Sequence, residues 1–159
     1  MKTTIKCFFL VCLLILNSCS NEEEGAIDEA SQDIPNEISI TDEILRLVNV
    51  HRQDNGLSIL EKNQTAEQMA IDHTNYMISV AEINHDNFNG RSNILRDQEN
   101  ARGAAENVAQ FYPSAESVVN GWLQSSGHRQ NIEGNYTYTG IAAIRDSNGR
   151  YYYTQIFYR

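Results

Sequence analysis

The chain has 159 residues and a formal net charge of −9 at pH 7. A surface of that charge repels phosphate backbones, so we expect no nucleic-acid partner. All three cysteines lie within the first 19 residues, and the rest of the chain therefore lacks disulfide and thiolate chemistry. Its stability must come from a hydrophobic core, and 141 residues from Cys19 onward are enough for one domain.

The N-terminus has the pattern of a bacterial targeting sequence. Lys2 and Lys6 form a short positive region before an uncharged apolar run over residues 7–16. This run is shorter than the roughly 20 residues of a membrane-spanning helix. The run ends in Leu16-Asn17-Ser18-Cys19, which resembles the lipobox of bacterial lipoproteins, where the chain is cut before a lipid-bearing cysteine. An ordinary secretory signal with an incidental cysteine is the alternative. We expect residues 1–18 to be a lipoprotein signal peptide, and a lipid on Cys19 to be the contact with the membrane.

Residues 19–40 are predicted to be an acidic, flexible tether. This segment is polar and has no apolar periodicity, and loss of Lys2 and Lys6 with the leader takes the net charge from −9 to −11. An acidic run directly behind the cysteine also resembles the surface-export signal of some Gram-negative lipoproteins. We therefore expect an exported protein that is anchored to the bacterial cell envelope, at the outer membrane or cell surface.

Helical periodicity begins at Thr41 and recurs twice. The first two apolar stripes have the spacing of one helix face, and Asn55-Gly56 ends the first of them. Asn63 or Thr65 is positioned to cap the second helix, and Ser114 to cap a third. The stripes comprise Ile44, Leu47, Val48 and His51, then Ala66, Met69, Ala70, His73 and Met77, and finally Val118, Val119, Trp122 and Leu123.

The remaining segments predict loops and a hairpin. Residues 83–100 are rich in Asn, Asp and Gly, which favours loops. Residues 138–145 and 151–158 are rich in strand-forming residues and flank the turn 146–149, which ends in Asn-Gly. Helices followed by strands predict an α+β domain over residues 41–159.

Two of the four histidines are candidates for a functional site. His51 and His73 lie on apolar helical stripes and are predicted to be packed in the core. His85 and His128 lie in polar segments, and Glu106 begins a short apolar run after another loop. Two imidazoles and a carboxylate suit zinc or a general acid and base around a water. Spacings of 21 and 22 residues have no local metal signature. Alternatively, Glu106 and His128 order their loop through hydrogen bonds, with Arg129 and Asn131 holding backbone groups between helix and sheet.

Seven segments in order resemble the CAP superfamily, also called SCP domains, which comprises cysteine-rich secretory proteins, antigen 5 and pathogenesis-related proteins. The similarity is greatest to its bacterial branch and covers residues 41–159. It implies a three-layer α-β-α sandwich with a central antiparallel sheet and a cleft on one face. The segments are VNVHRQDNGLSIL (48–60), AEQMAIDHTNYM (66–77), INHDNFNGR (83–91), AENVA (105–109), VVNGWLQSSGHRQNI (118–132), YTGIAA (138–143) and YYYTQIFY (151–158).

The resemblance implies that His85, Glu106 and His128 line the family's cleft, which often carries two histidines and two glutamates. Ser125 stands where the second glutamate would fall, as in many bacterial members, and Ala105 replaces the glycine before Glu106. This residue set agrees with a site for Zn²⁺ or another divalent metal that has an open coordination position. It agrees equally with no bound metal. Asn107 and Gln155 are interpreted as hydrogen-bonding scaffold and Trp122 as a core residue.

Two functions follow from this interpretation. The first is an exported, lipid-anchored domain that binds an unidentified ligand or protein partner at the envelope. The alternative is a metal-assisted, peptidase-like hydrolase in which Glu106 moves the proton of a zinc-bound water. The missing second glutamate favours binding without catalysis. A serine hydrolase using Ser125 or Ser126 beside His128 is disfavoured, because the sequence has no nucleophile elbow.

Overall fold

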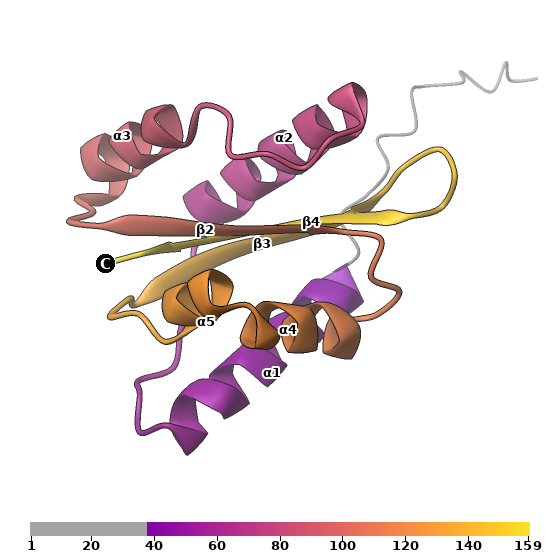
Figure 1. Ribbon diagram of the computed structural model, residues 1–159. Coiled ribbons are helices and arrows are strands. Elements are labelled where there is room, and N and C mark those ends of the chain that lie inside the picture. Colours follow the sequence, from indigo (N-terminus) through magenta and orange to yellow (C-terminus); the bar gives the residue numbers. More distant parts are fainter. Residues whose placement is uncertain (1–37) are drawn as a thin grey trace, which may run out of the picture. The chain divides into compact units, whose positions relative to one another are not determined.

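A four-stranded sheet lies between two layers of helices (Figure 1). The computed structural model describes residues 38–159, which lie within one compact unit of the chain, Gln32–Arg159. The predicted signal peptide, the lipid-bearing Cys19 and the tether up to residue 37 lie outside the described residues. The first helix begins at Ile38, so the last three residues predicted for the tether are helical.

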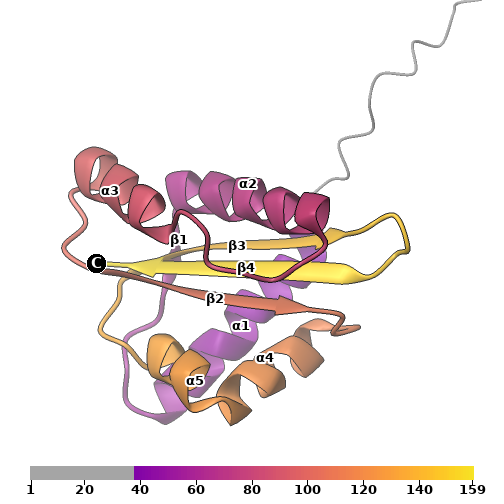
Figure 2. The same cartoon turned by 45° about the horizontal axis from the view of Figure 1, so that its top comes forward.

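Residues 38–159 form five helices and four strands. Helices α2 and α3 cover one face of the sheet, and α1, α4 and α5 cover the other face (Figures 1 and 2). Within this part of the chain no helix is long and apolar enough to cross a bilayer. The helices are α1 (Ile38–Asp54), α2 (Gln64–Val80), α3 (Phe88–Glu99), α4 (Ala115–Gln124) and α5 (Ser126–Ile132), and the strands are β1 (Glu61–Lys62), β2 (Ala104–Gln110), β3 (Tyr138–Arg145) and β4 (Tyr151–Tyr158).

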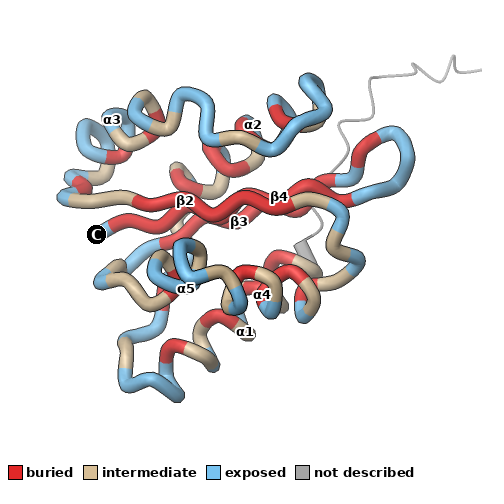
Figure 3. Tube along the Cα trace, viewed as in Figure 1, coloured by how far each residue is buried: buried red, intermediate tan, exposed pale blue. Residues whose placement is uncertain are grey.

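The sheet has the order β1-β3-β4-β2. β4 is antiparallel to both β2 and β3, and the short β1 runs parallel to β3, so the sheet is mixed rather than wholly antiparallel. Every residue of β4 is buried, which matches its central place between the two helical layers (Figure 3). The predicted three-layer α-β-α sandwich is thus confirmed, with β1 as the parallel exception.

Local signals in the sequence account for the helix starts and the hairpin. The Asn63 side chain accepts a hydrogen bond from the Ala66 N–H at the start of α2, and Ser114 forms a capping box with Ser117 at the start of α4. β3 and β4 have the predicted bounds, and Gly149 has a φ of 75° in the turn between them.

Residues 88–99 form helix α3, so the loop predicted there is wrong over most of its length. The Asn-rich composition marks the helix ends instead, because Asn87 and Asn100 both adopt the left-handed conformation. Leu95 and Arg91 are buried on the inner side of α3. Tertiary contacts of these two side chains override the weak helical propensity of the segment.

Candidate functional site

Glu106 lies on β2 with its carboxylate buried between the sheet and the α2–α3 layer. Alternation along the strand sends its neighbours Ala105 and Asn107 to the opposite face, toward α1, α4 and α5. The side chain of Glu106 is only 1% exposed. A buried carboxylate requires compensating partners, and the structure supplies them from α2, α3 and the loop between these helices.

Arg91 of α3 is the main partner of Glu106. Its Nε and Nη2 atoms each lie 2.9 Å from a different carboxylate oxygen, which makes a two-pronged ion pair. Its Nη1 atom donates to the Asp86 backbone oxygen at 2.8 Å, which ties the loop to the same guanidinium. Both oxygens of Glu106 are therefore engaged by a positive charge.

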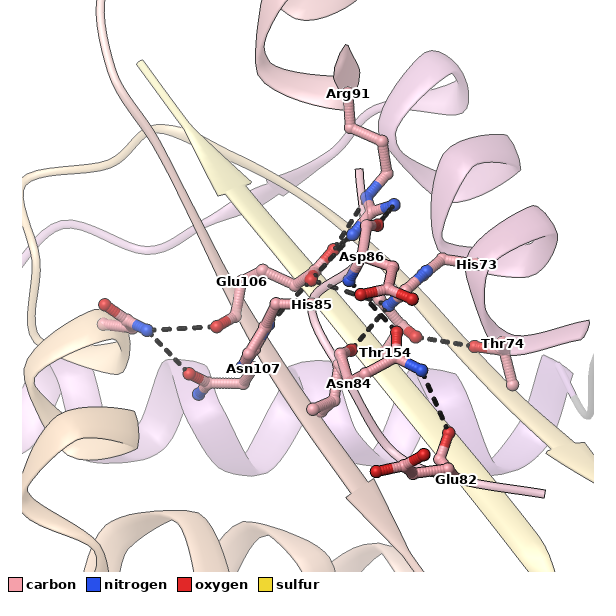
Figure 4. Close-up of polar contacts among 12 residues, drawn as sticks. His73, Thr74, Glu82, Asn84, His85, Asp86, Arg91, Glu106, Asn107 and Thr154 are labelled. Atoms are coloured by element: carbon pink, nitrogen blue, oxygen red, sulfur yellow. Dashed lines mark hydrogen bonds and ion pairs between the residues drawn. The ribbon is translucent and has the colours of Figure 1, made fainter. Parts of the chain in front are cut away.

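His85 adds a second contact to the same carboxylate (Figure 4). Its Nδ1 lies 2.8 Å from Glu106 Oε1, while its own side chain is 52% exposed. Because an ionised carboxylate only accepts hydrogen bonds, Nδ1 carries the proton in this contact.

His73 packs behind this cluster from α2. Its Nε2 lies 2.8 Å from the Asn84 backbone oxygen and 3.7 Å from Glu106 Oε1, and the side chain is 1% exposed. Burial lowers the pKa of His73, even though the bond to Asn84 and the charge of Glu106 act in the opposite direction. The histidine is thus buried as predicted, but it belongs to the Glu106 cluster rather than to a purely apolar core.

Two asparagines join α5 to β2 on the other face of the sheet. Asn107 is fully buried, and its Nδ2 donates to the His128 backbone oxygen at 3.1 Å. Asn131 Nδ2 donates to Asn107 Oδ1 at 2.9 Å and lies 3.2 Å from the Glu106 backbone oxygen. We call this pair the asparagine clasp. It fixes the backbone of His128 beside the strand that carries Glu106.

An electrostatic interaction with His85, in the loop between α2 and α3, reaches His128 in α5. Burial lowers the pKa of His128, and the charge of a protonated His85 lowers it further. The structure brings His85 and Glu106 into direct contact, and among the described residues the His128 ring makes no bond to Glu106. We use the name histidine cleft for the cleft that the family resemblance implies beside these two imidazoles.

The three candidate residues do not make a three-ligand metal set as they stand. Among residues 38–159, no group of three or more His, Cys, Asp or Glu side chains could hold a metal ion. The physical reason is Arg91, since a guanidinium occupies both oxygens of Glu106 and repels a nearby cation. A divalent metal would have the two imidazoles alone.

Arg91 is the side chain at this site that sequence reasoning missed. It lies within a segment that carries the family resemblance, but nothing in its spacing indicates that it pairs with Glu106. Asn131 holds a backbone group of the sheet, as the structural interpretation of its segment predicts. The scaffold residues behave as predicted: Trp122 is buried and donates to the Val108 backbone oxygen at 3.3 Å, and Gln155 donates to Thr139 Oγ1 at 3.3 Å. His51 is half-buried rather than packed in the core as predicted, and its Nε2 lies 2.9 Å from Glu133 Oε1, outside this site.

Comparison with known proteins agrees with the architecture and the motifs. Residues 45–157 match the family described as CAP, the cysteine-rich secretory protein family. The chain belongs to this family. The resemblance inferred from the seven segments is thereby confirmed.

Individual relatives are bacterial. The membrane protein YlbC of Bacillus subtilis (strain 168) is 33% identical over 121 residues, which are 72% of this chain and 33% of that protein. An extracellular protein containing an SCP domain from Bacillus anthracis (strain Ames) has a TM-score of 0.64 at 29% identity, with 74% of this chain and 39% of that one covered. An outer surface protein of Borrelia burgdorferi shares the fold, with a TM-score of 0.69, 18% identity and coverages of 76% and 92%. The chain spans about a third of the length of YlbC.

Proposed function

We propose that this chain is an exported, lipid-anchored CAP-domain protein that binds a ligand or partner at the cell envelope through the histidine cleft. Its leader and Cys19 support export and anchoring, as do the likenesses to an extracellular SCP-domain protein and to a protein named as a membrane protein. Outer-membrane or cell-surface placement is the finer part of the proposal, and it rests on the acidic run behind Cys19.

The observation that supports the binding role is the difference in solvent exposure between the side chains of His85 and Glu106, which are in contact. A half-exposed imidazole is held in one orientation by a carboxylate that is 1% exposed. A buried acid contributes nothing to the packing of an exposed ring. It does fix the tautomer and the orientation of the ring, which helps a residue that contacts a ligand. The other ring nitrogen of His85, Nε2, can then form a hydrogen bond with a ligand.

Binding is favoured over hydrolysis by the contacts of Glu106. A proton shuttle needs a carboxylate oxygen that a water can reach, but Arg91 and His85 already occupy the oxygens of Glu106. Ser125 and Ser126 offer no alternative, because within residues 38–159 neither has a hydrogen bond to the His128 ring. The cleft therefore has the composition of a recognition site.

Site-specific photo-crosslinking on intact cells tests the proposal. A benzophenone amino acid at Arg129, an exposed position of α5 next to His128, should give an adduct that disappears when His85 and His128 are both replaced by Ala. A probe at Ser147, in the turn between β3 and β4, is the matched control and should give none. The same adduct from both positions, or an adduct unaffected by the histidine changes, would rule the cleft out as the contact surface.

The metal is tested with ZnCl₂ on the full chain, purified in a non-ionic detergent. With two imidazoles as ligands we expect weak binding that is lost in both His85→Ala and His128→Ala, and unchanged in the control His51→Ala. Imidazole NMR shifts report the binding site directly. Equal zinc affinity in the wild type and in both cleft variants would remove Zn²⁺ from the cleft.

Anchoring is tested separately by Cys19→Ala. Without the thiol no lipid can be attached, so we expect the protein to move from the membrane fraction to the soluble fraction. Retention in the membrane fraction would contradict lipidation at this residue.

A further inference from the structure

A cavity of about 470 Å³ lies between α2 and α3, next to the Glu106 cluster, with which it shares His73 and Arg91. Its size falls within the range of about 300–1,000 Å³ that is typical of small-molecule sites. Met69, His73 and Tyr76 contribute from one face of α2, and Asn87, Arg91 and Ile94 from one face of α3. None of His85, Glu106 and His128 lines it.

The charged groups of this cavity leave a net negative charge. Arg91 is the cation in its wall, but that charge is already compensated by Glu106. Asp72 and Asp86 receive hydrogen bonds from neutral donors, Gln68 and Tyr76, at 2.9 and 2.7 Å. Among the residues that the structure describes, neither carboxylate has an ion-pair partner, and both residues are exposed to solvent.

The remaining walls are aromatic and aliphatic. The Tyr76 ring is 41% exposed and stacks on His73, with the ring centroids 6.0 Å apart. Ile94 is 42% exposed on the opposite wall, and Met69 lies between the two helices. A ring face beside carboxylates attracts an organic cation, and the aliphatic side chains provide an apolar surface for its body.

We infer that this cavity is a second binding site, selective for a primary ammonium group carried on an aliphatic chain. Asp72 and Asp86 would bind the ammonium, Tyr76 would contact it through its ring face, and Met69 and Ile94 would cover the chain. The net negative charge of the protein, −9, also favours the approach of a cation.

The test compares three probes of equal length on the full chain in a non-ionic detergent. Pentylamine is protonated at pH 7, 1-pentanol is its neutral counterpart and pentanoate its anionic one. We expect backbone NMR shifts around the cavity with pentylamine, at least tenfold weaker binding of 1-pentanol and no binding of pentanoate. Equal binding of the amine and the alcohol, or shifts confined to other parts of the domain, would overturn the inference without any variant.

A variant pair assigns the charges. Replacing both Asp72 and Asp86 with Asn keeps the side-chain size and the oxygen acceptors, and should weaken pentylamine binding at least tenfold. Asp97→Asn removes one charge from α3, which lines the cavity, but at a position outside it, and should change the affinity less than twofold. Unchanged pentylamine affinity in the double variant would show that these carboxylates do not bind the amine.

Discussion

Arg91 holds both carboxylate oxygens of Glu106, through Nε and Nη2 at 2.9 Å each, in a part of the fold that solvent barely reaches. The pair joins α3 to the sheet and holds the acid that orients His85. It also places a positive charge beside this carboxylate, which disfavours a cation at its oxygens.

Removing the guanidinium should destabilise the fold strongly. Arg91→Met leaves a buried, unpaired carboxylate, and we expect the free energy of unfolding to fall by about 3–5 kcal/mol. Urea denaturation measures this loss. The double variant with Glu106→Gln should recover part of it, and Arg96→Met, at an exposed position of the same helix, should change little. A loss in Arg91→Met no larger than in Arg96→Met would contradict the role given to the pair.

Loss of the asparagine clasp should loosen α5. Asn107→Ala removes the donor to the His128 backbone oxygen and the acceptor for Asn131, at an expected cost of about 1–3 kcal/mol. Hydrogen–deuterium exchange should be faster over residues 126–132 than in the wild type. Asn120→Ala, at an exposed site of α4, serves as the control. Unaltered exchange in α5 would mean that the clasp does not hold the helix.

Gly140 sets the distance between α2 and β3. A Cβ atom there would lie 2.0 Å from the Ala66 carbonyl carbon and 2.1 Å from the Glu67 nitrogen, which are backbone atoms that cannot turn aside. Gly140→Ala should therefore cost about 1–3 kcal/mol or more, measured as a fall in the unfolding free energy. Gly127→Ala, where nothing lies within 4 Å, should be neutral or slightly stabilising. Similar stabilities of the two variants would refute the close packing.

His73 should make the fold less stable at mildly acidic pH. Burial lowers its pKa below the ordinary value of 6.5, so the unfolded chain takes up the proton at a higher pH than the folded chain. The stabilising contribution is complete above pH 6.5 and declines as the pH falls toward the lower folded pKa. Urea titrations at pH 7.5, 6.5 and 5.5 should show this decline. His73→Gln should flatten it over the same interval, and an unchanged pH dependence would count against the buried histidine.

The elements that sequence analysis predicted well are those with strong local signals. The hairpin 138–158 has its turn chemistry and strand-forming residues side by side, and Ser114 and Asn63 mark their helices through capping. Helix α3 lacked such a signal, because its stability comes from burying Arg91 and Leu95 against distant elements rather than from its own composition.

The sequence predicted which residues form the candidate site, but not the hydrogen bonds and ion pairs that they make. Family resemblance pointed to His85, Glu106 and His128, and the structure places the first two in contact. The guanidinium at Glu106 could not be foreseen, since an ion pair between a helix and a strand 15 residues apart leaves no periodic trace. His73 shows the converse: its apolar stripe indicated burial and gave no sign of the nearby acid.

The order of strands has a consequence for the timing of assembly. β2 and β3 are not neighbours, and β4 is the strand that pairs with both of them. A ribosome makes β2 about 40 residues before it makes the partner that closes the sheet. A chain that is still passing through an export channel would therefore lack its central strand. Its sheet could not close, and the chain would remain unfolded enough for transport until residues 151–158 had emerged on the far side.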